Sequence, residues 1–522
     1  MSPLPGWLEP LPDAAEQRAL DGWAINELGI PGLELMERAG RGLTDLVVER
    51  VPEGRIVVVC GKGNNGGDGL VTARMLRAQG REVTVLLLGA GEELKGDARA
   101  NYERLGGPAP EPFAASALDG AAGIVDAILG TGFEGEPRDP AASAIAAISA
   151  AGRAGGSGTS GGSVVIACDV PSGVNASTGE VAGVAVTAAA TATFHAAKPG
   201  LWIAPGKEHA GDVRVVDIGI PDGGPGDPMV GLIGDAVTDG VPRRGRDSTK
   251  FAAGSVLVCG GSTGLTGAPC LASEASMRAG AGYVTACVPA SLNLIFESRL
   301  LEVMTVPIAD RHGAIAAAAG AEVLERTGRV QALVLGPGLG RDPETVTFAR
   351  ELASDAELPL LLDADGLGAH AGELGALAAR SAPTVLTPHA GELGRLLGID
   401  SAEVGAHRLE MARRAAGEAQ AIVVLKGDDT IVAHPDGRAA VSRGGAPALA
   451  TAGTGDVLSG ITGAYLAKGM DPFHAACAAV HVHVVSGQLA AQTFGPEGVV
   501  ASDVIAMLPR ALPAIGAGAP VG

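Results

Sequence analysis

The sequence predicts two tandem α/β domains, each built around a parallel sheet. Short apolar runs alternate with helical stretches along the chain, as in sheets whose strands are joined by helical crossovers. At roughly 100–200 residues per domain, the length of 522 residues suggests two to four domains, and two large ones are favoured. The pattern also starts again after a Pro/Gly-rich stretch at 221–228. We place the domains at residues 1–225 and 226–522.

The first half begins with helical spacing over residues 13–48. A Gly-rich loop at 61–69 is expected to precede a helix from about Leu70 to Gln79, which Gly80 ends. A further helix from Ala141 leads into a Gly/Ser-rich insertion at about 154–163. The expected strands are Arg55–Cys60, Val83–Leu88, Gly123–Leu129, Val164–Cys168, Ala192–His195 and Val213–Ile218.

The second half repeats the alternation with different motifs, so it predicts a second, different α/β domain. Its expected strands are Val256–Cys259, Tyr283–Cys287, Ala332–Leu335, Leu358–Asp363, Thr384–Leu386 and Ala421–Leu425.

Composition and charge exclude several classes of protein. The net charge of −20 disfavours nucleic acid and anionic membranes as partners. None of the six cysteines forms a CxxC pair, which indicates buried, reduced thiols in a cytoplasmic protein. No signal peptide and no apolar run long enough to span a membrane are apparent. We also expect a homo-oligomer.

The first candidate site is the segment Gly61–Gly69, whose glycines match the dinucleotide pattern G-x-G-x-x-G. No acidic residue ends the next strand, which argues against an ordinary NAD-dependent dehydrogenase. Asn64, Asn65 and Asp68 are polar side chains among glycines at a strand's carboxyl end, and they suggest a ligand site. The alternative is a turn that uses Asn in a left-handed conformation.

Two further strand ends should meet this segment at the same edge of a parallel sheet. One carries Asp126 and the loop 130–135, whose N–H groups suit a phosphate, and the other carries Asp169 and Ser172. Oxygens of Asn65, Asp126 and Ser172 would together make an all-oxygen cation site. Asp126 could equally be a hydrogen-bonded core acid.

The motifs NNGGDG, VDAILGTGFEG, DVPSG and AAKPGL, over about residues 10–220, resemble the NAD(P)H-hydrate epimerase domain, which is Rossmann-like. The resemblance implies that Asn65, Asp126 and Ser172 bind potassium and that Asp169 contacts the damaged nicotinamide ring as a catalytic proton shuttle. It also implies a larger set of residues that hold the hydrated dinucleotide, which are Asn64, Asn65, Gly66, Gly67, Asp68, Gly130, Thr131, Gly132, Phe133, Glu134, Gly135, Glu136 and Asp169.

The second candidate site is the segment Ala452–Gly460, in which glycines precede a helix that starts near Asp456. Free N–H groups at such a helix end suit a phosphoryl group in transfer, and a carboxylate there could accept a hydroxyl proton. The alternative is a helix cap with an acidic residue. Other motifs past strand ends supply Glu392 for a metal-bound water, His389 for the substrate, and Lys426 and Thr430 for nucleotide phosphate. His481 and His483 lie two apart on an expected helix, which makes a poor metal pair.

The motifs LGPGLG, LDADG, TPHAGE, LKGDDT and AGTGD, over about residues 245–510, resemble the ribokinase-like superfamily, and within it the ADP-dependent NAD(P)H-hydrate dehydratase. The resemblance implies that Ala268, Gly338 and His389 contact the hydrated nicotinamide and that Asp456 is the catalytic base. The residues implied to bind ADP are Lys426, Gly427, Asp428, Asp429, Thr430, Gly453, Thr454 and Gly455.

Together the resemblances imply repair of hydrated NADH and NADPH. The first domain would interconvert the R and S epimers with potassium, and the second would dehydrate the S epimer with ADP and magnesium, giving AMP and phosphate. Two alternatives stay open: a vitamin-type small-molecule kinase fused to a nucleotide-binding domain, and a dinucleotide-sensing first domain without catalysis.

Overall fold

The computed structural model describes residues 4–153, 162–246 and 248–512. The chain divides into two compact units. The first contains Pro10–Gly231, and the second begins at Leu232 and also takes in the short segment Pro5–Glu9. The expected Gly/Ser-rich insertion lies mostly outside the described residues. Within the described ranges, no helix has the length and apolar character needed to cross a membrane.

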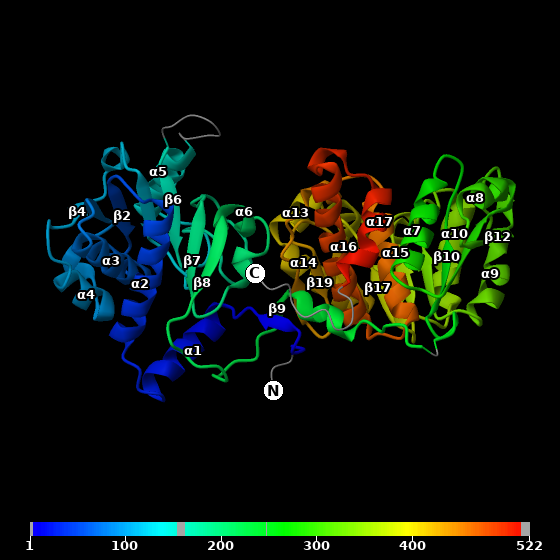
Figure 1. The fold of residues 1–522 in the computed structure, drawn as a ribbon, viewed down its shortest axis with the longest axis horizontal. Helices are drawn as coiled ribbons and strands as arrows, with labels where there is room; N and C mark the ends of the chain where they lie inside the picture. Colours follow the sequence, from blue (N-terminus) through cyan, green and yellow to red (C-terminus); the bar gives the residue numbers. More distant parts are fainter. Residues whose placement is uncertain (1–3, 154–161, 247, 513–522) are drawn as a thin grey trace. The chain divides into compact units, whose positions relative to one another are not determined.

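The first unit contains a seven-stranded, fully parallel sheet in the order β4-β3-β2-β5-β6-β7-β8 (Figure 1). The strand order reverses between β2 and β5, and parallel sheets bind ligands at such a reversal, outside the carboxyl ends of the strands. The strands are β2 (Ile56–Cys60), β3 (Val83–Leu87), β4 (Glu111–Pro112), β5 (Gly123–Ala127), β6 (Val164–Cys168), β7 (Ala190–Phe194) and β8 (Asp212–Val216).

Helices cover both faces of this sheet, so the unit has three layers. Val58 packs into one core with α2 and α3, while its neighbour Val57 packs into the other core with α5, because side chains alternate along a strand. The helices are α1 (Ala14–Asn26), α2 (Gly32–Arg50), α3 (Asn64–Ala78), α4 (Gly96–Glu103), α5 (Ala141–Arg153) and α6 (Gly206–Ala210).

Two helix predictions in this unit are wrong in detail. The helical stretch 13–48 is two helices, α1 and α2, because Gly29 takes a positive φ of 70° and Pro31 caps the second helix. Helix α3 starts at Asn64, not near Leu70, so most of the expected loop 61–69 is its first two turns. Asn and Gly are poor helix formers, and tertiary packing outweighs their propensity here.

The second unit contains an eleven-stranded sheet in the order β1-β9-β20-β19-β18-β17-β16-β15-β10-β11-β12. The run from β18 to β12 is parallel, and β18, β19 and β20 pair antiparallel. The strands are β1 (Leu8–Pro10), β9 (Val230–Ile233), β10 (Ser255–Cys259), β11 (Tyr283–Pro289), β12 (Met304–Ile308), β15 (Ala332–Leu335), β16 (Leu360–Leu362), β17 (Thr384–Leu386), β18 (Ile422–Leu425), β19 (Ile431–Ala433) and β20 (Ala439–Val441). The hairpin β13 (Asp310–Arg311) and β14 (Ala314–Ile315) lies apart.

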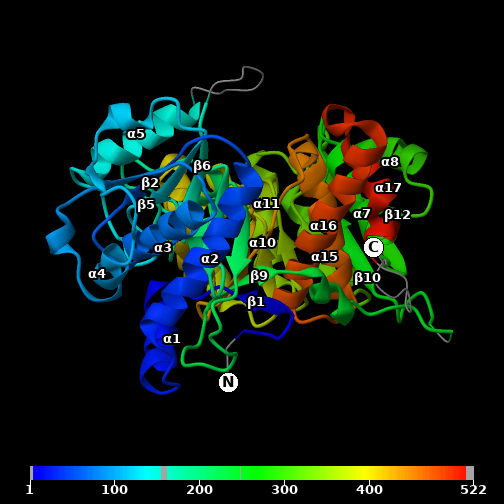
Figure 2. The same ribbon diagram turned by 60° about the vertical axis from the view of Figure 1, so that its left-hand side comes forward.

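Helices α7, α15, α16 and α17 of this unit pack on one another, and α15 also contacts β10 and β15 (Figure 2). The helices are α7 (Gly267–Arg278), α8 (Asn293–Arg299), α9 (Gly320–Thr327), α10 (Pro343–Asp355), α11 (Asp365–Gly368), α12 (Ala390–Leu397), α13 (Ser401–Ala406), α14 (Arg408–Ala419), α15 (Thr454–Ala467), α16 (Pro472–Phe494) and α17 (Ala501–Ala511). The predicted fold class of two α/β units with parallel sheets is confirmed, and all six cysteines are free and buried.

Candidate functional sites

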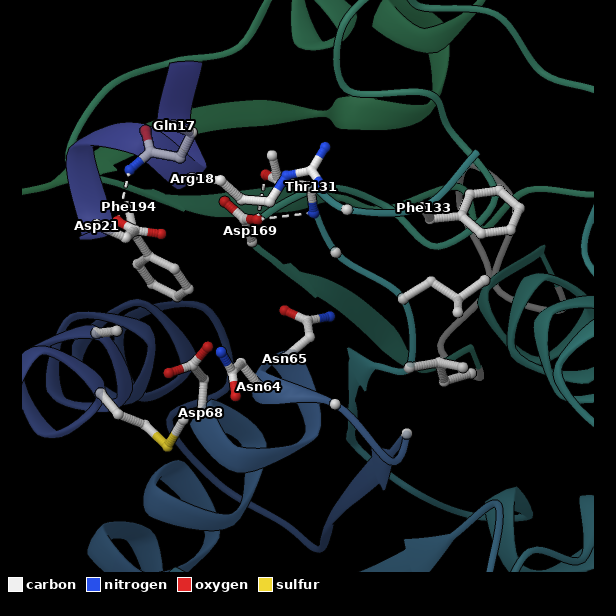
Figure 3. A pocket seen from close by; sticks show the side chains of 18 of the residues that line it. Gln17, Arg18, Asp21, Asn64, Asn65, Asp68, Thr131, Phe133, Asp169 and Phe194 are labelled. Carbon is white, nitrogen blue, oxygen red and sulfur yellow. Dashed lines mark hydrogen bonds between the residues drawn. The ribbon is translucent and has the colours of Figure 1, made fainter. Parts of the chain in front are cut away.

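The first unit holds a cavity of about 1010 Å³ at the carboxyl ends of β2, β5, β6 and β7 (Figure 3). Helix α1 contributes Gln17, Arg18 and Asp21 to its wall, and the first turns of α3 contribute Asn64, Asn65 and Asp68. The loop after β5 supplies residues 128–134. The cavity therefore lies where the sheet order reverses, and its size fits an organic ligand.

Glycines make the close approach of α3 to the neighbouring strand ends possible. A Cβ on Gly61 would lie 2.1 Å from the carbonyl oxygen of Ile128, and a Cβ on Gly66 would lie 2.1 Å from that of Gly61. Gly67 packs against Met36 in the same way. Gly66 and Gly67 therefore shape the backbone and do not line the cavity, nor do Gly135 and Glu136 among the expected ligand contacts.

Asp169, directly after β6, is paired with a lysine that the sequence analysis did not single out. The Nζ of Lys198 donates to Asp169 Oδ1 at 2.8 Å, to Thr193 Oγ1 at 2.9 Å and to the carbonyl oxygen of Phe194 at 2.9 Å. Its side chain is 1% exposed. Lys198 is the polar residue of the AAKPGL motif, and a lysine in such an apolar run could have signalled a buried partner.

The surroundings of Asp169 keep its carboxyl group ionised. Thr131 donates to Oδ2 from both its backbone nitrogen, at 3.0 Å, and its hydroxyl group. Burial acts to raise the pKa of Asp169, but the charge and hydrogen bond of Lys198, together with Thr131, hold it below the ordinary value. Asp169 also has a positive φ of 67°, which is uncommon for aspartate and points to a constrained, functional position.

Asn65, Asp126 and Ser172 stand at or shortly after the carboxyl ends of β2, β5 and β6, and Asn65 also lines the cavity. Ser172 donates to Asp126 Oδ1 at 2.6 Å from its hydroxyl and to Oδ2 at 2.8 Å from its backbone nitrogen. Burial raises the pKa of Asp126 to about 6. Both polar atoms of the Asn65 side chain are buried and have no hydrogen-bond partner among the described residues. An unpaired buried amide and a buried carboxylate are oxygen donors of the kind that bind a monovalent cation.

In the second unit, Asp456 lies in the first turn of α15. The residue that caps this helix is Gly453, which has a φ of 91°. Burial raises the pKa of Asp456 to about 7, with added repulsion from Asp363, and Lys426 acts in the opposite direction. A Cβ on Gly455 would lie 3.6 Å from Lys426 Nζ, so the ammonium group faces the start of the helix. This carboxyl group can exchange a proton near neutral pH.

Lys426 contacts two carboxylates, that of Asp363 after β16 and that of Glu392 in α12. Its Nζ lies 3.0 Å from Asp363 Oδ1 and 3.6 Å from Glu392 Oε2, and Ser459 donates to Asp363 Oδ2 at 2.7 Å. Burial acts to lower the pKa of Lys426, but Asp363 and Glu392 raise it above the ordinary value. Asp363 belongs to the LDADG motif and was not singled out, although an acid directly after a buried strand is a clear signal.

The side chains of Asp428, Asp429 and Thr430 are bonded to other groups of the protein. Asp429 pairs with the buried Arg408, whose Nε lies 2.7 Å from Oδ2. Asp428 Oδ1 accepts from the backbone nitrogen of Gly445 at 2.8 Å, and the Thr430 hydroxyl donates to the carbonyl oxygen of Gly427 at 2.6 Å. These contacts fix the turn. Arg408, which holds the turn through Asp429, was not predicted from the sequence.

His389 caps helix α12. Its Nδ1 accepts from the backbone nitrogens of Gly391 at 3.0 Å and Glu392 at 3.3 Å, which assigns the ring proton to Nε2. The side chain is 55% exposed, so Nε2 can reach a ligand. Gly338 and Ala268 also lie together, since a Cβ on Gly338 would be 3.3 Å from that of Ala268.

His483, expected only to be a poor metal ligand, is buried against the start of α15. It hydrogen-bonds the backbone at Thr454, and burial lowers its pKa to about 4. The ring is therefore neutral at physiological pH and supports the turn that carries Gly455 and Asp456. Nothing in the spacing of His481 and His483 indicates this role.

Comparison with known proteins matches each unit to one family. Residues 256–510 match the family described as NAD(P)H-hydrate dehydratase, and residues 32–200 match the family described as YjeF-related protein N-terminus. The chain is 39% identical to the bifunctional NAD(P)H-hydrate repair enzyme Nnr of Moorella thermoacetica, covering 96% of both chains. It is 38% identical to the enzyme of the same name from Salinibacter ruber, again over 96% of both chains.

A solved structure resembles part of the chain. It is the ADP/ATP-dependent NAD(P)H-hydrate dehydratase of Bacillus subtilis, co-crystallised with ATP and Mg²⁺. It is 30% identical, covers 53% of this chain and 95% of its own, and has a TM-score of 0.45.

We predict that Lys198→Met lowers the free energy of unfolding of the first unit by about 3–5 kcal/mol at neutral pH, because Asp169 is left as an unpaired buried carboxylate. The loss should shrink as the pH falls and Asp169 becomes protonated. Calorimetry of the full chain at several pH values measures this. Arg214→Met, which breaks a surface ion pair with Glu49, is the control and should change little. Equal losses of stability in the two variants would contradict a buried ion pair between Lys198 and Asp169.

Proposed function

Because the chain belongs to the family of bifunctional NAD(P)H-hydrate repair enzymes, we propose that its two units carry out two steps of one repair. The first unit interconverts the R and S epimers of hydrated NADH and NADPH. The second removes water from the S epimer at the expense of ADP. The observation that supports this most directly is that relatives of this name, up to 39% identical, match both units over 96% of the chain.

The dehydration chemistry follows from the position of Asp456. Its carboxylate accepts the proton of the C6 hydroxyl group as that oxygen bonds to the β-phosphorus of ADP and the bond to AMP breaks. The resulting phosphate ester is a better leaving group than hydroxide. The ring nitrogen lone pair then expels phosphate from C6, and loss of a proton from C5 completes the double bond.

The residues around Asp456 support binding of a charged nucleotide. Lys426 and the free N–H groups at the start of α15 face the same point and would neutralise the transferring phosphoryl group. The side chains of Asp428, Asp429 and Thr430 are used within the protein, so we propose that this turn contacts ADP through its backbone. The Nε2 proton of His389, with Gly338 and Ala268, would hold the nicotinamide ring.

Magnesium fits the carboxylates of this site. Asp363 and Glu392 converge on Lys426, and Asp365 accepts from the backbone nitrogen of Gly340 at 2.9 Å. Glu392 would hold a metal-bound water. Bound magnesium would neutralise charge on the diphosphate.

In the first unit, the expected ligand residues that line the cavity are Asn64, Asn65, Asp68, Gly130, Thr131, Gly132, Phe133, Glu134 and Asp169. We propose that they hold the hydrated dinucleotide, with Asp169 beside the nicotinamide ring. Potassium would bind Asn65, Asp126 and Ser172, and the unpaired amide of Asn65 supports this. Potassium would supply positive charge that compensates the buried Asp126.

The vitamin-type kinase is not supported, because the relatives that span both units are named as repair enzymes. The non-catalytic sensing role of the first unit, the cytoplasmic location and the homo-oligomer stay predictions.

The proposed function as a whole is tested by incubating hydrated NADH with the full chain. We expect the near-ultraviolet absorbance of reduced nicotinamide to return only when ADP and magnesium are both present. Both epimers should be consumed, because the first unit resupplies the S form. If well-folded protein restores no absorbance, the proposed dehydratase activity is wrong. If consumption stops while the R epimer remains, the proposed epimerase activity is wrong.

The role of Asp456 predicts a pH dependence. The base must be ionised, so the dehydration rate should rise about tenfold per pH unit below the pKa of about 7 and level off above it. Asp456→Asn should lower the rate by about 10²–10⁴-fold across the range. The control Asp355→Asn, at the exposed end of α10, should behave as the unaltered protein. A flat pH profile would argue against Asp456 as the base.

The potassium site predicts a selective response to cations. Potassium should raise both the rate of epimer exchange and the melting temperature of the first unit, while lithium should not. Asn65→Leu should abolish both responses without lowering stability in potassium-free buffer, because it replaces an unpaired buried amide. ADP-dependent dehydration of the S epimer serves as the internal control. Potassium responses that persist in Asn65→Leu would disprove this site.

A further inference from the structure

The acids that line the cavity of the first unit are Asp21, Asp68, Asp97, Glu134 and Asp169. Three of them, Asp21, Asp68 and Asp169, interact electrostatically with one another, and two of these three have partners there. Asp169 is bound by Lys198 and Thr131, and Asp21 accepts from Gln17 Nε2 at 2.9 Å. The side chain of Asp68 makes no hydrogen bond and no ion pair with any residue in the described ranges. It is the one acid of the three that is free to bond with a ligand.

The position of Asp68 makes it accessible to a ligand and poorly accessible to solvent. It lies on the second turn of α3, one turn after Asn64, and its side chain points into the cavity (Figure 3). The residue is 8% exposed. The apolar residues Leu35, Met36 and Ala39 of α2 line the same wall of the cavity. An ordered ligand in this cavity would therefore be the main polar partner of Asp68.

The surroundings shift the pKa values of Asp68 and Asp169 in opposite directions. Burial raises the pKa of Asp68 well above the ordinary value, and the negative charges of Asp169 and Asp21 add to the rise. The pKa of Asp169 is lowered. The titratable or charged groups that face Asp68 from other elements are Asp21 on α1, Cys60 on β2, Cys168 on β6, Asp169 after β6 and Lys198 after β7. Two acids in one site with opposite shifts define a proton donor and a fixed anion.

We propose that Asp68 is the catalytic residue that donates and recovers the proton during epimerisation, while Asp169 stays ionised throughout and stabilises positive charge on the ring. This inference rests on the proposed epimerase function. It reassigns the proton shuttle that the sequence analysis placed on Asp169. The reason is geometric, since every oxygen of Asp169 already accepts hydrogen bonds from the protein and those of Asp68 do not.

The proton and electron balance closes with these groups and solvent water. Protonated Asp68 gives its proton to the C6 hydroxyl group, the C6–O bond breaks, and water leaves while the ring nitrogen lone pair forms a C=N bond. The ring now carries one positive charge, which faces the carboxylate of Asp169. Water adds to the opposite face of C6, the C=N electron pair returns to nitrogen, and the proton released from that water passes to solvent. The Asp68 carboxylate recovers one proton from solvent, and the other epimer has formed.

The decisive experiment measures epimer exchange and dehydration separately on the full-length chain. Exchange is followed by chromatography from one purified epimer without ADP, and dehydration of the S epimer is followed with ADP and magnesium. Asp68→Asn keeps the size of the side chain and removes the proton, so exchange should fall by about 10²–10⁴-fold while dehydration is unchanged. The control Asp45→Asn, on the exposed side of α2, should match the unaltered protein in both assays.

Two further measurements exclude a merely structural effect. Asp68→Asn should melt no lower than the unaltered protein above neutral pH, because it removes a buried acid that is repelled by Asp169 and Asp21. The exchange rate of the unaltered protein should fall as the pH rises through the raised pKa of Asp68, because the donor loses its proton. Near-normal exchange by Asp68→Asn, or a rate that does not fall at alkaline pH, overturns the inference. Absence of exchange in the unaltered protein would instead disprove the proposed epimerase function.

Discussion

In each unit a lysine forms an ion pair with an acid that directly follows a parallel strand. Lys198 pairs with Asp169 at 2.8 Å and Lys426 pairs with Asp363 at 3.0 Å, and both acids directly follow a buried parallel strand. An ammonium group can compensate only the acids close to it. In each unit another aspartate has a raised pKa, chiefly because it is buried: Asp68 in the first and Asp456 in the second. Both sites therefore place a lysine-paired aspartate near an aspartate whose pKa is raised by burial.

The parallel sheets place these charged residues together at one edge of each sheet. All strands of the first sheet, and the strands from β18 to β12 of the second, run in one direction, so the segments that follow them gather at one edge. Helices also begin at that edge, as α3 and α15 do, and their free N–H groups favour anionic ligands there. Gly61 and Gly66 let two such segments come into backbone contact. The fold thus brings an anion site and a buried acid together without a basic surface, consistent with the net charge of −20.

The strands and the motifs at their ends were predictable from local pattern. Val164–Cys168, Ala332–Leu335 and Thr384–Leu386 have the expected bounds, because a strand buried on both faces is a continuous apolar run. The start of α3 was not predictable, because Asn64–Gly69 is poor in helix formers and is held helical by packing against Gly61 and Met36. The short antiparallel strands β19 and β20 were missed because three residues give no clear periodicity.

The sequence by itself determined the two parallel α/β units and the polar residues that follow their strands, because apolar runs and glycines act over a few neighbouring positions. Only the tertiary structure decided the charge state of those residues. Asp169 and Lys198 lie 29 positions apart, and Lys426 and Asp363 lie 63 apart. Whether a carboxyl group is ionised depends on the burial and the charges around it, and those come from segments that only the folded chain brings together.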